Sequence, residues 1–147
     1  MKPLRLEIEG FGSFPGNEVI DFAALAHRGL FVVTGPTGAG KSTIFDAMVY
    51  ALYGTLPGDR SVTEIRSQHV DHTTPTRVVL DFEMGGFAYR ITRNPPYERV
   101  SKRGKGTATQ TAGATLEALG DETSVTTGSI ACTERIKEII GLEAAQI

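Results

Sequence analysis

The octapeptide at residues 35–42, Gly-Pro-Thr-Gly-Ala-Gly-Lys-Ser, constrains the fold of this chain more than any other stretch. It matches G-x-x-x-x-G-K-[ST], a pattern in which a glycine-rich loop follows a strand and opens a helix. Residues 30–34 are an apolar, β-rich run, which predicts a strand that ends at the loop. Between residues 42 and 53 apolar side chains recur at helical spacing, and Gly54 follows as a C-cap. Both flanks favour a P-loop, or Walker A motif, over a glycine-rich surface turn.

Each residue type in this loop suits a phosphate chain. Glycines let the chain approach backbone N–H groups, and the helix N-terminus offers further unpaired N–H groups. Lys41 is placed to reach the β- and γ-phosphates, Ser42 offers a hydroxyl to Mg²⁺, and Thr43 adds a hydroxyl near the α-phosphate. We therefore expect ATP and Mg²⁺ to bind here, through Gly35, Pro36, Thr37, Gly38, Ala39, Gly40, Lys41, Ser42 and Thr43.

A P-loop binds nucleotide but needs a metal-fixing carboxylate and a positioned water to hydrolyse it. One candidate carboxylate is Asp81, because residues 78–81 resemble a Walker B strand that ends in an acidic residue. A Walker B carboxylate ends a fully buried parallel strand, whereas alternation continues past Asp81 and resumes after Gly85-Gly86. This pattern favours a β-hairpin. The alternative is a stand-alone P-loop kinase or NTPase that uses Asp81 for its metal.

Composition limits the other classes of function. The chain has 147 residues, 40% hydrophobic and 22% charged, which suits one soluble globular domain over residues 1–147. A net charge of −2 gives no general attraction to nucleic acid or acidic lipid. The single cysteine, Cys132, excludes an internal disulfide and fits a reducing cytoplasm, and we interpret it as a small helix residue rather than a reactive thiol. No apolar run is long enough to span a membrane.

The remaining chain predicts mainly strands. Alternation over residues 4–9 predicts a strand ended by Gly10, followed by a turn over residues 11–17 and a short strand over residues 19–22. We interpret this as an antiparallel pair that leads into a parallel core. Residues 107–119 predict a strand that pairs with the basic stretch before it. A last amphipathic helix carries Ile130, Ile136, Ile139 and Ile140, with residues 133–135 on its outer face and Gly141 at its end.

Two segments leave interpretations open. Residues 56–75 are predicted to form a long loop with one helical turn near residues 62–67. We interpret its His69 and His72 as solvated side chains rather than as a pair of metal ligands. Residues 90–105 are basic around Tyr97, so they are either a solvated hairpin tip or a contact to nucleic acid or nucleotide. A DNA-binding module is therefore a second alternative function. The basic residues are Arg90, Arg93, Arg99, Lys102, Arg103 and Lys105.

Several stretches together resemble the N-terminal ATPase lobe of the SbcC family, which is related to the SMC ATPases. The most specific is residues 35–43 followed by Phe45-Asp46-Ala47 and by Ala51-Leu52-Tyr53-Gly54. Further matching stretches are residues 1–6, 10–14, 20–22, 29–34, 66–67, 89–91 and 139–142. The resemblance covers nearly the whole chain.

The resemblance implies an α/β P-loop NTPase fold, the N-terminal lobe of an ABC-type ATPase head, with a mixed sheet, an antiparallel β subdomain and a P-loop helix. Residues 1–147 would then be a single AAA/ABC-type lobe that is incomplete without a C-terminal lobe carrying the signature motif and Walker B. In the family, ATP lies between two heads of a homodimer and drives an SbcD-like nuclease on DNA ends in double-strand-break repair, in the cytoplasm. The isolated chain is expected to bind ATP without efficient hydrolysis.

This sequence departs from the family at two places. Some relatives carry an Arg after the first strand that helps hold adenine, and Gly12 stands there in this chain. The Q-loop glutamine of the family follows a stretch that this chain lacks, so Gln146 does not take that role.

Overall fold

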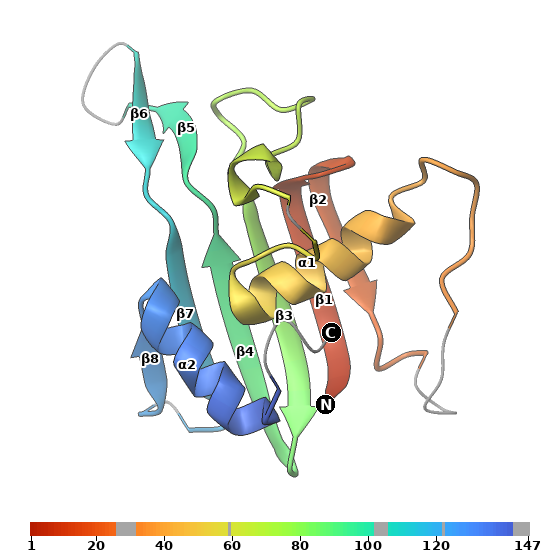
Figure 1. Ribbon diagram of the computed structural model, residues 1–147, viewed down its shortest axis with the longest axis vertical. Helices are drawn as coiled ribbons and strands as arrows, with labels where there is room; N and C mark the ends of the chain where they lie inside the picture. Colours follow the sequence, from red (N-terminus) through yellow and green to blue (C-terminus); the bar gives the residue numbers. More distant parts are fainter. Residues whose placement is uncertain (26–31, 59, 102–105, 122, 143–147) are drawn as a thin grey trace.

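A six-stranded sheet with both helices on one face forms the body of the computed structural model, which describes residues 1–25, 32–58, 60–101, 106–121 and 123–142 (Figure 1). The strand order is β2–β1–β3–β4–β7–β8, and every pairing is antiparallel. These strands are β1 (Lys2–Phe11), β2 (Phe14–Asp21), β3 (Arg77–Met84), β4 (Phe87–Asn94), β7 (Gly113–Leu119) and β8 (Val125–Thr127). A separate two-stranded sheet consists of β5 (Tyr97–Val100) and β6 (Thr107–Gln110). The helical elements are α1 (Lys41–Tyr53), α2 (Ser129–Ile140) and the 3₁₀ turn η2 (Val62–Glu64).

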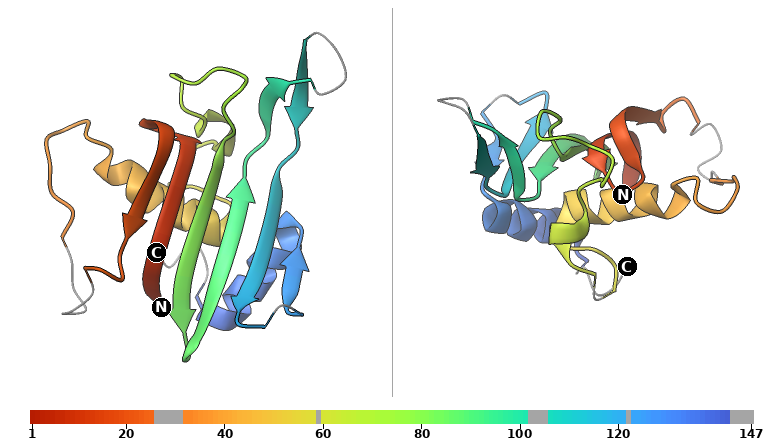
Figure 2. Two further views of the ribbon diagram at one scale, coloured as in Figure 1. Left: turned by 180° about the vertical axis from the view of Figure 1, so that it is seen from behind. Right: turned by 90° about the horizontal axis from the view of Figure 1, so that it is seen from above.

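The core lies between the sheet and the two helices, which Figure 2 shows on the same face. Alternate residues of a strand point to the same face, so β1 contributes Leu6 and Ile8 to the core. The neighbouring β3 adds Leu80 and Phe82 in the same way, and α2 adds Ile136 from above. The predicted alternation of these two strands is therefore confirmed.

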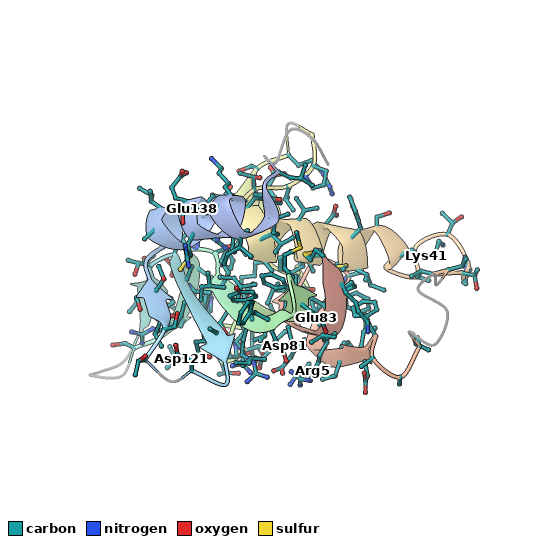
Figure 3. The ribbon with its side chains drawn as sticks, turned by 90° about the horizontal axis from the view of Figure 1, so that it is seen from below. Arg5, Lys41, Asp81, Glu83, Asp121 and Glu138 are labelled. Carbon is teal, nitrogen blue, oxygen red and sulfur yellow. The ribbon has the colours of Figure 1, made fainter. Side chains whose placement is uncertain are left out.

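The opposite face of the sheet is charged and is not covered by either helix. The carboxylate of Glu7 accepts hydrogen bonds from Arg5 at 2.7 Å and from Arg77 at 2.8 Å. The hydrogen bond from Arg5 is the main reason why the pKa of Glu7 is lowered. Asp81 forms a two-pronged ion pair with Arg90, with both distances 2.7 Å. Figure 3 shows Arg5, Asp81 and Glu83 on the side of the sheet away from the helices.

Both predicted helices are confirmed, including their C-caps. Gly54 and Gly141 adopt the left-handed conformation, and their N–H groups donate to Tyr50 O at 2.8 Å and Lys137 O at 2.7 Å. The β3–β4 hairpin around Gly85-Gly86 is also confirmed. The basic stretch pairs with the chain after it as predicted, but the single strand expected over residues 107–119 is divided into β6 and β7. Among the described residues, no helix has the length and apolar character that a membrane span requires.

Several strand boundaries differ from the prediction. β1 continues through Gly10 to Phe11 with a register irregularity after Glu9, and β2 already begins at Phe14. The predicted turn over residues 11–17 is thus wrong beyond Gly12-Ser13, because antiparallel pairing with β1 extends the strand across a weak local pattern. The short strand β8 was not predicted at all, since it has only three residues.

The main difference from the prediction is the missing strand before the P-loop. Residues 32–34 form no strand, and Val32 and Val33 are 77% and 45% exposed, while residues 30 and 31 lie outside the described part of the chain. A strand is stabilised by a hydrogen-bonded neighbour. Within the described residues no strand lies alongside this run, so the expected parallel core, and with it the mixed sheet, does not form there. The predicted combination of helices and strands is confirmed, but the sheet is antiparallel.

Candidate functional site

The P-loop runs in an exposed arc into the first turn of α1. Gly40 is the N-cap of α1 and adopts the left-handed conformation, with φ of +85°, as Gly38 also does. A Cβ at Gly40 would lie only 2.7 Å from the ring of Phe14 on β2. Glycine is therefore required at position 40 both by the backbone conformation and by the close approach of the aromatic ring.

The N-terminus of α1 is arranged as an anion-binding site. The first-turn N–H groups of a helix have no intrahelical acceptors, and α1 has neither a capping side chain nor an acidic residue in its first turn. The preceding residues 35–39 are all exposed. The positive end of the helix dipole therefore faces solvent beside a glycine-rich loop, where a phosphate group is favoured.

The side chains that the sequence assigned to phosphate and metal lie together at this helix end. Lys41 Nζ folds back over the loop and donates to Gly35 O at 2.7 Å and to Pro36 O at 2.6 Å. Ser42 is exposed, whereas Thr43 is largely buried. The nine predicted residues, Gly35, Pro36, Thr37, Gly38, Ala39, Gly40, Lys41, Ser42 and Thr43, thus form one continuous loop and helix turn.

A second turn, at Gly12-Ser13, packs against the P-loop. Ser13 Oγ lies 3.1 Å from Thr43 Oγ1, which orients the threonine hydroxyl. Gly12 has φ of +56°, and a Cβ there would lie 2.5 Å from Thr43 Cγ2. The position at which some relatives carry an Arg is thus closed to a side chain in this backbone arrangement. Sequence reasoning did not assign Ser13 to the site, although the Gly-Phe-Gly-Ser-Phe stretch was a signal for it.

An ion pair on α1 was also missed by sequence reasoning. Asp46 lies one helical turn after Ser42, and Arg60 donates to its two carboxylate oxygens at 2.7 and 2.5 Å. The hydrogen bonds from this guanidinium to Asp46 raise the pKa of Arg60. The pair joins the long loop to the P-loop helix beside the predicted metal ligand.

An open hollow adjoins the P-loop on the side of the Gly12-Ser13 turn. Its volume is about 390 Å³, and it is lined by Gly12, Ser13, Gly38, Glu64, Arg66, Gln68 and His69. Most of these side chains are polar, so the hollow suits a hydrated polar ligand better than an apolar one.

The C-terminal end of α1 is held by Arg93, which comes from β4. Arg93 is 2% exposed, and its guanidinium donates to Ala51 O at 3.0 Å and to Leu52 O at 3.3 Å. It also donates to Thr133 Oγ1 at 3.1 Å, so Thr133 faces inward and its predicted outer position is wrong. Burial lowers the pKa of Arg93. The cation compensates the negative end of the helix dipole, and it fixes α1 to both the sheet and α2.

Known proteins are similar to this chain over nearly its whole length. The family model described as an AAA domain matches residues 5–146. The chain belongs to the AAA domain family. Three of its relatives carry the name of the SbcC subunit of the SbcCD nuclease. The protein from Lactococcus lactis is 40% identical, that from Vibrio cholerae 38% and that from Staphylococcus aureus 34%, each over 99% of this chain.

These relatives confirm the resemblance to the SbcC family. The chain spans only 14 to 15% of the length of the three relatives.

Within the AAA domain, Asp81 does not lie where a P-loop metal would bind. It sits in the middle of β3, between two antiparallel neighbours, and both of its oxygens accept from Arg90. It also faces away from α1, on the charged side of the sheet (Figure 3). The hairpin interpretation is correct, and a stand-alone NTPase that uses Asp81 has no geometric support.

The basic segment of the AAA domain is not one surface. Arg90 lies on the charged face with Asp81, whereas Arg93 is buried on the opposite face beneath α1. Arg99 donates to Gln110 Oε1 across the β5–β6 hairpin at 3.1 Å. Lys102, Arg103 and Lys105 lie outside the described residues. A single DNA-binding patch formed by all six basic residues is therefore excluded.

Two smaller predictions concern histidine and cysteine. His69 and His72 are exposed, and the described residues contain no cluster of potential ligands that could hold a metal ion. Cys132 is fully buried, its thiol donates to Thr126 O at 3.2 Å, and burial raises its pKa. Its interpretation as a packed helix residue is confirmed, because a protonated, inaccessible thiol is a poor nucleophile.

Proposed function

We propose that residues 1–147 form the Walker A lobe of an SbcC-type ATPase head, and that they bind Mg²⁺-ATP through Gly35 to Thr43. The observation that carries the proposal is the uncapped N-terminus of α1, where an exposed glycine loop, Lys41 and two hydroxyl residues meet. Phosphate oxygens would replace Gly35 O and Pro36 O as acceptors for Lys41. Ser42 would bind Mg²⁺ through its exposed hydroxyl.

The open hollow beside Gly38 is the proposed position of the nucleoside. It adjoins the P-loop directly, and its polar lining can accept and donate hydrogen bonds to a ribose or a base. Because no side chain fits at Gly12, the contacts would come from Ser13, Glu64 and the backbone of the Gly12-Ser13 turn rather than from an arginine. This arrangement would explain how the chain holds a nucleotide without the arginine of its relatives.

We further propose that the lobe requires a second, C-terminal lobe to hydrolyse ATP. The exposed run at residues 32–34 has β-rich sequence without a strand beside it in the described part of the chain. Next to it, a largely apolar hollow on α1 is lined partly by Val33, Ile44, Phe45 and Met48. Strands from a missing lobe would pair with the first feature and cover the second.

The wider role follows from the relatives rather than from the site. The relatives named for the SbcC subunit of the SbcCD nuclease are far longer than this chain, and their name places them with a nuclease. We therefore propose that the complete protein forms a homodimer of heads, and that it drives an SbcD-like nuclease on DNA ends during double-strand-break repair in the cytoplasm.

The first experiment is calorimetric titration of the chain with Mg²⁺-ATP and Mg²⁺-ADP, combined with steady-state turnover. Lys41→Ala tests the site, and Lys2→Ala, at an exposed lysine on β1, is the matched control. We expect binding that Lys41→Ala weakens more than about tenfold, a difference of about 1.4 kcal/mol, and no turnover above the buffer rate.

The other outcomes discriminate the alternatives. Turnover that Lys41→Ala abolishes would show that the chain is a complete ATPase and would refute the need for a second lobe. Absence of binding in the unsubstituted chain, or equal binding by Lys41→Ala, would refute the nucleotide site itself.

A further inference from the structure

The β5–β6 hairpin is attached to the long loop through one arginine. The guanidinium of Arg66 lies over the ring of Tyr97 on β5, 4.9 Å from the ring centroid. Nearby, Val100 N–H donates to His72 O at 3.0 Å. Figure 1 shows the hairpin and this loop at the same end of the main sheet. The cation–π contact and the backbone hydrogen bond thus hold the hairpin against residues 65–76.

Arg66 also organises the loop that it belongs to. While its face lies on the Tyr97 ring, its edge donates to Thr76 Oγ1, to Asp71 O and to Thr74 O, the last at 3.0 Å. A planar guanidinium can stack and donate in its plane at the same time, whereas a lysine ammonium cannot. The residue therefore joins the hairpin and the loop into one unit.

The same unit is hydrogen-bonded to the turn beside the P-loop. Gly12 N–H donates to Ile65 O at 2.7 Å, and Ser67 N–H donates to Gly10 O at 3.0 Å. Arg66 itself pairs with Phe11 as a β-bridge between these two hydrogen bonds. The backbone on either side of Arg66 thus sets the position of the Gly12-Ser13 turn.

The Gly12-Ser13 turn and the residue after it contact the P-loop at two points. Ser13 Oγ contacts the hydroxyl of Thr43, and the ring of Phe14 lies against Gly40. Arg66 in addition lines the open hollow beside Gly38. One continuous series of contacts therefore runs from the hairpin through Arg66 to the residues that would hold a nucleotide.

We propose that Arg66 is a positioning residue for the nucleotide site and that it couples this site to the β5–β6 hairpin. The inference rests on the proposed function, because it requires nucleotide to bind at the P-loop. Nucleotide stabilises the Gly12-Ser13 turn, the turn stabilises residues 65–67, and Arg66 then holds Tyr97 more firmly. Coupling of this kind is reciprocal, so an attached hairpin favours nucleotide binding by the same factor.

The test is hydrogen–deuterium exchange at the amide of Val100, followed by NMR with and without saturating Mg²⁺-ADP. Its hydrogen bond to His72 reports hairpin attachment, and neither residue lines the hollow proposed for the nucleoside. In the unsubstituted chain we expect nucleotide to slow this exchange by about two- to fivefold, the factor that a cation–π contact at an exposed site provides. Arg66→Lys should abolish the slowing and weaken Mg²⁺-ADP binding by a similar factor.

Tyr97→Leu and Tyr97→Phe are the matched pair. Leucine removes the aromatic face while keeping apolar bulk, and phenylalanine keeps the face. We expect the response at Val100 to be lost in Tyr97→Leu and retained in Tyr97→Phe, with thermal midpoints recorded for all variants. The pair keeps the test decisive even if Arg66→Lys does not fold.

The outcomes separate this inference from the proposed function. If Mg²⁺-ADP binds in a Lys41-dependent manner but Val100 exchange does not respond, the coupling is refuted and the nucleotide site stands. The same holds if the response is equal in Tyr97→Leu and Tyr97→Phe. If Lys41-dependent binding is absent altogether, both the site and the coupling are refuted.

Discussion

Residues 78–80, Val-Val-Leu on β3, and residues 32–34, Val-Val-Thr before the P-loop, are both short runs rich in β-branched residues, yet only the first forms a strand. Val78 is fully buried between β1 and β4, whereas Val32 is 77% exposed. β-propensity expresses how well a side chain fits a pleated, half-buried surface, so it has no effect without neighbouring strands. The two runs therefore share a local preference and differ in what lies beside them.

The molecule accordingly has two kinds of region. The sheet has antiparallel hydrogen bonds on both sides of β1, β3, β4 and β7, and its apolar face is covered by helices. The P-loop side has the uncapped end of α1, an exposed run and an apolar hollow. Stability therefore resides in the first region and the proposed nucleotide site in the second, as is common in proteins whose sites use less stable segments.

The largest expected effect on the stability of the fold is at the junction of these two regions. Arg93→Met should lower the free energy of unfolding by about 3 kcal/mol, because Ala51 O and Leu52 O would be left buried without their donor. Urea denaturation measures the change. Arg99→Met, on the partly exposed hairpin, is the control and should stay within about 0.5 kcal/mol. Equal effects of the two substitutions would mean that the sheet does not hold α1 through Arg93.

The second prediction tests the two valine runs directly. Val78→Ala should lower the free energy of unfolding by about 2 kcal/mol, through lost burial and the cavity that remains. Val32→Ala should change it by less than about 0.5 kcal/mol, because that side chain is already in solvent. Both values come from urea midpoints of the same chain. A large effect at Val32 would show that the run before the P-loop is packed in solution, and the contrast between the two runs would disappear.

The third prediction compares two glycines near the boundary. Gly12→Ala should cost about 1 to 2 kcal/mol, because its φ is +56° and the new methyl group would collide with Thr43. Gly16→Ala should be nearly neutral, since Gly16 has no positive φ and, among the described residues other than its chain neighbours, no atom lies within 4 Å of the place that its Cβ would take.

Mg²⁺-ADP affinity provides the second measurement for this pair. We expect Gly12→Ala to weaken binding as well as stability, because its collision partner belongs to the P-loop. Unchanged affinity in a folded Gly12→Ala variant would show that the Gly12-Ser13 turn does not position the site.

The smallest effect concerns the charged face of the sheet. Because the pKa of Glu7 is lowered in the folded protein, its ionised form contributes stability above the unfolded pKa, and this contribution is lost as pH falls through the folded pKa. Glu7→Gln should therefore destabilise the protein by at most about 1 kcal/mol at neutral pH, since its arginine partners are partly exposed. The difference should vanish in acid. Exposed Glu18→Gln is the control, and a difference that persists in acid would contradict an ion-pair origin.

Patterns of short range predicted much of this molecule. The helices end at Gly54 and Gly141 as expected, because a left-handed C-cap is a local property of glycine. The β3–β4 hairpin and the alternation of β1 likewise follow from neighbouring residues. The P-loop motif was evident for the same reason, since its eight residues are contiguous.

Those short-range patterns did not predict the contacts between residues that are distant in the sequence. Alternation along β4 places Arg93 and Arg90, three positions apart, on opposite faces, but it does not predict that Arg93 donates to α1 or that Arg90 pairs with Asp81. Ser13 and Arg60 reach the P-loop helix only because the chain folds back on it.

The helices, the hairpins and the glycine-lysine-serine chemistry of the loop could thus be read from the order of the amino acids, because each depends on residues a few positions apart. The folded chain was needed to show which arginine is buried, which hydroxyl meets Thr43, and whether a β-rich run becomes a strand. Burial and strand pairing both depend on a neighbour in space. That neighbour is specified by the whole fold and not by the adjacent residues.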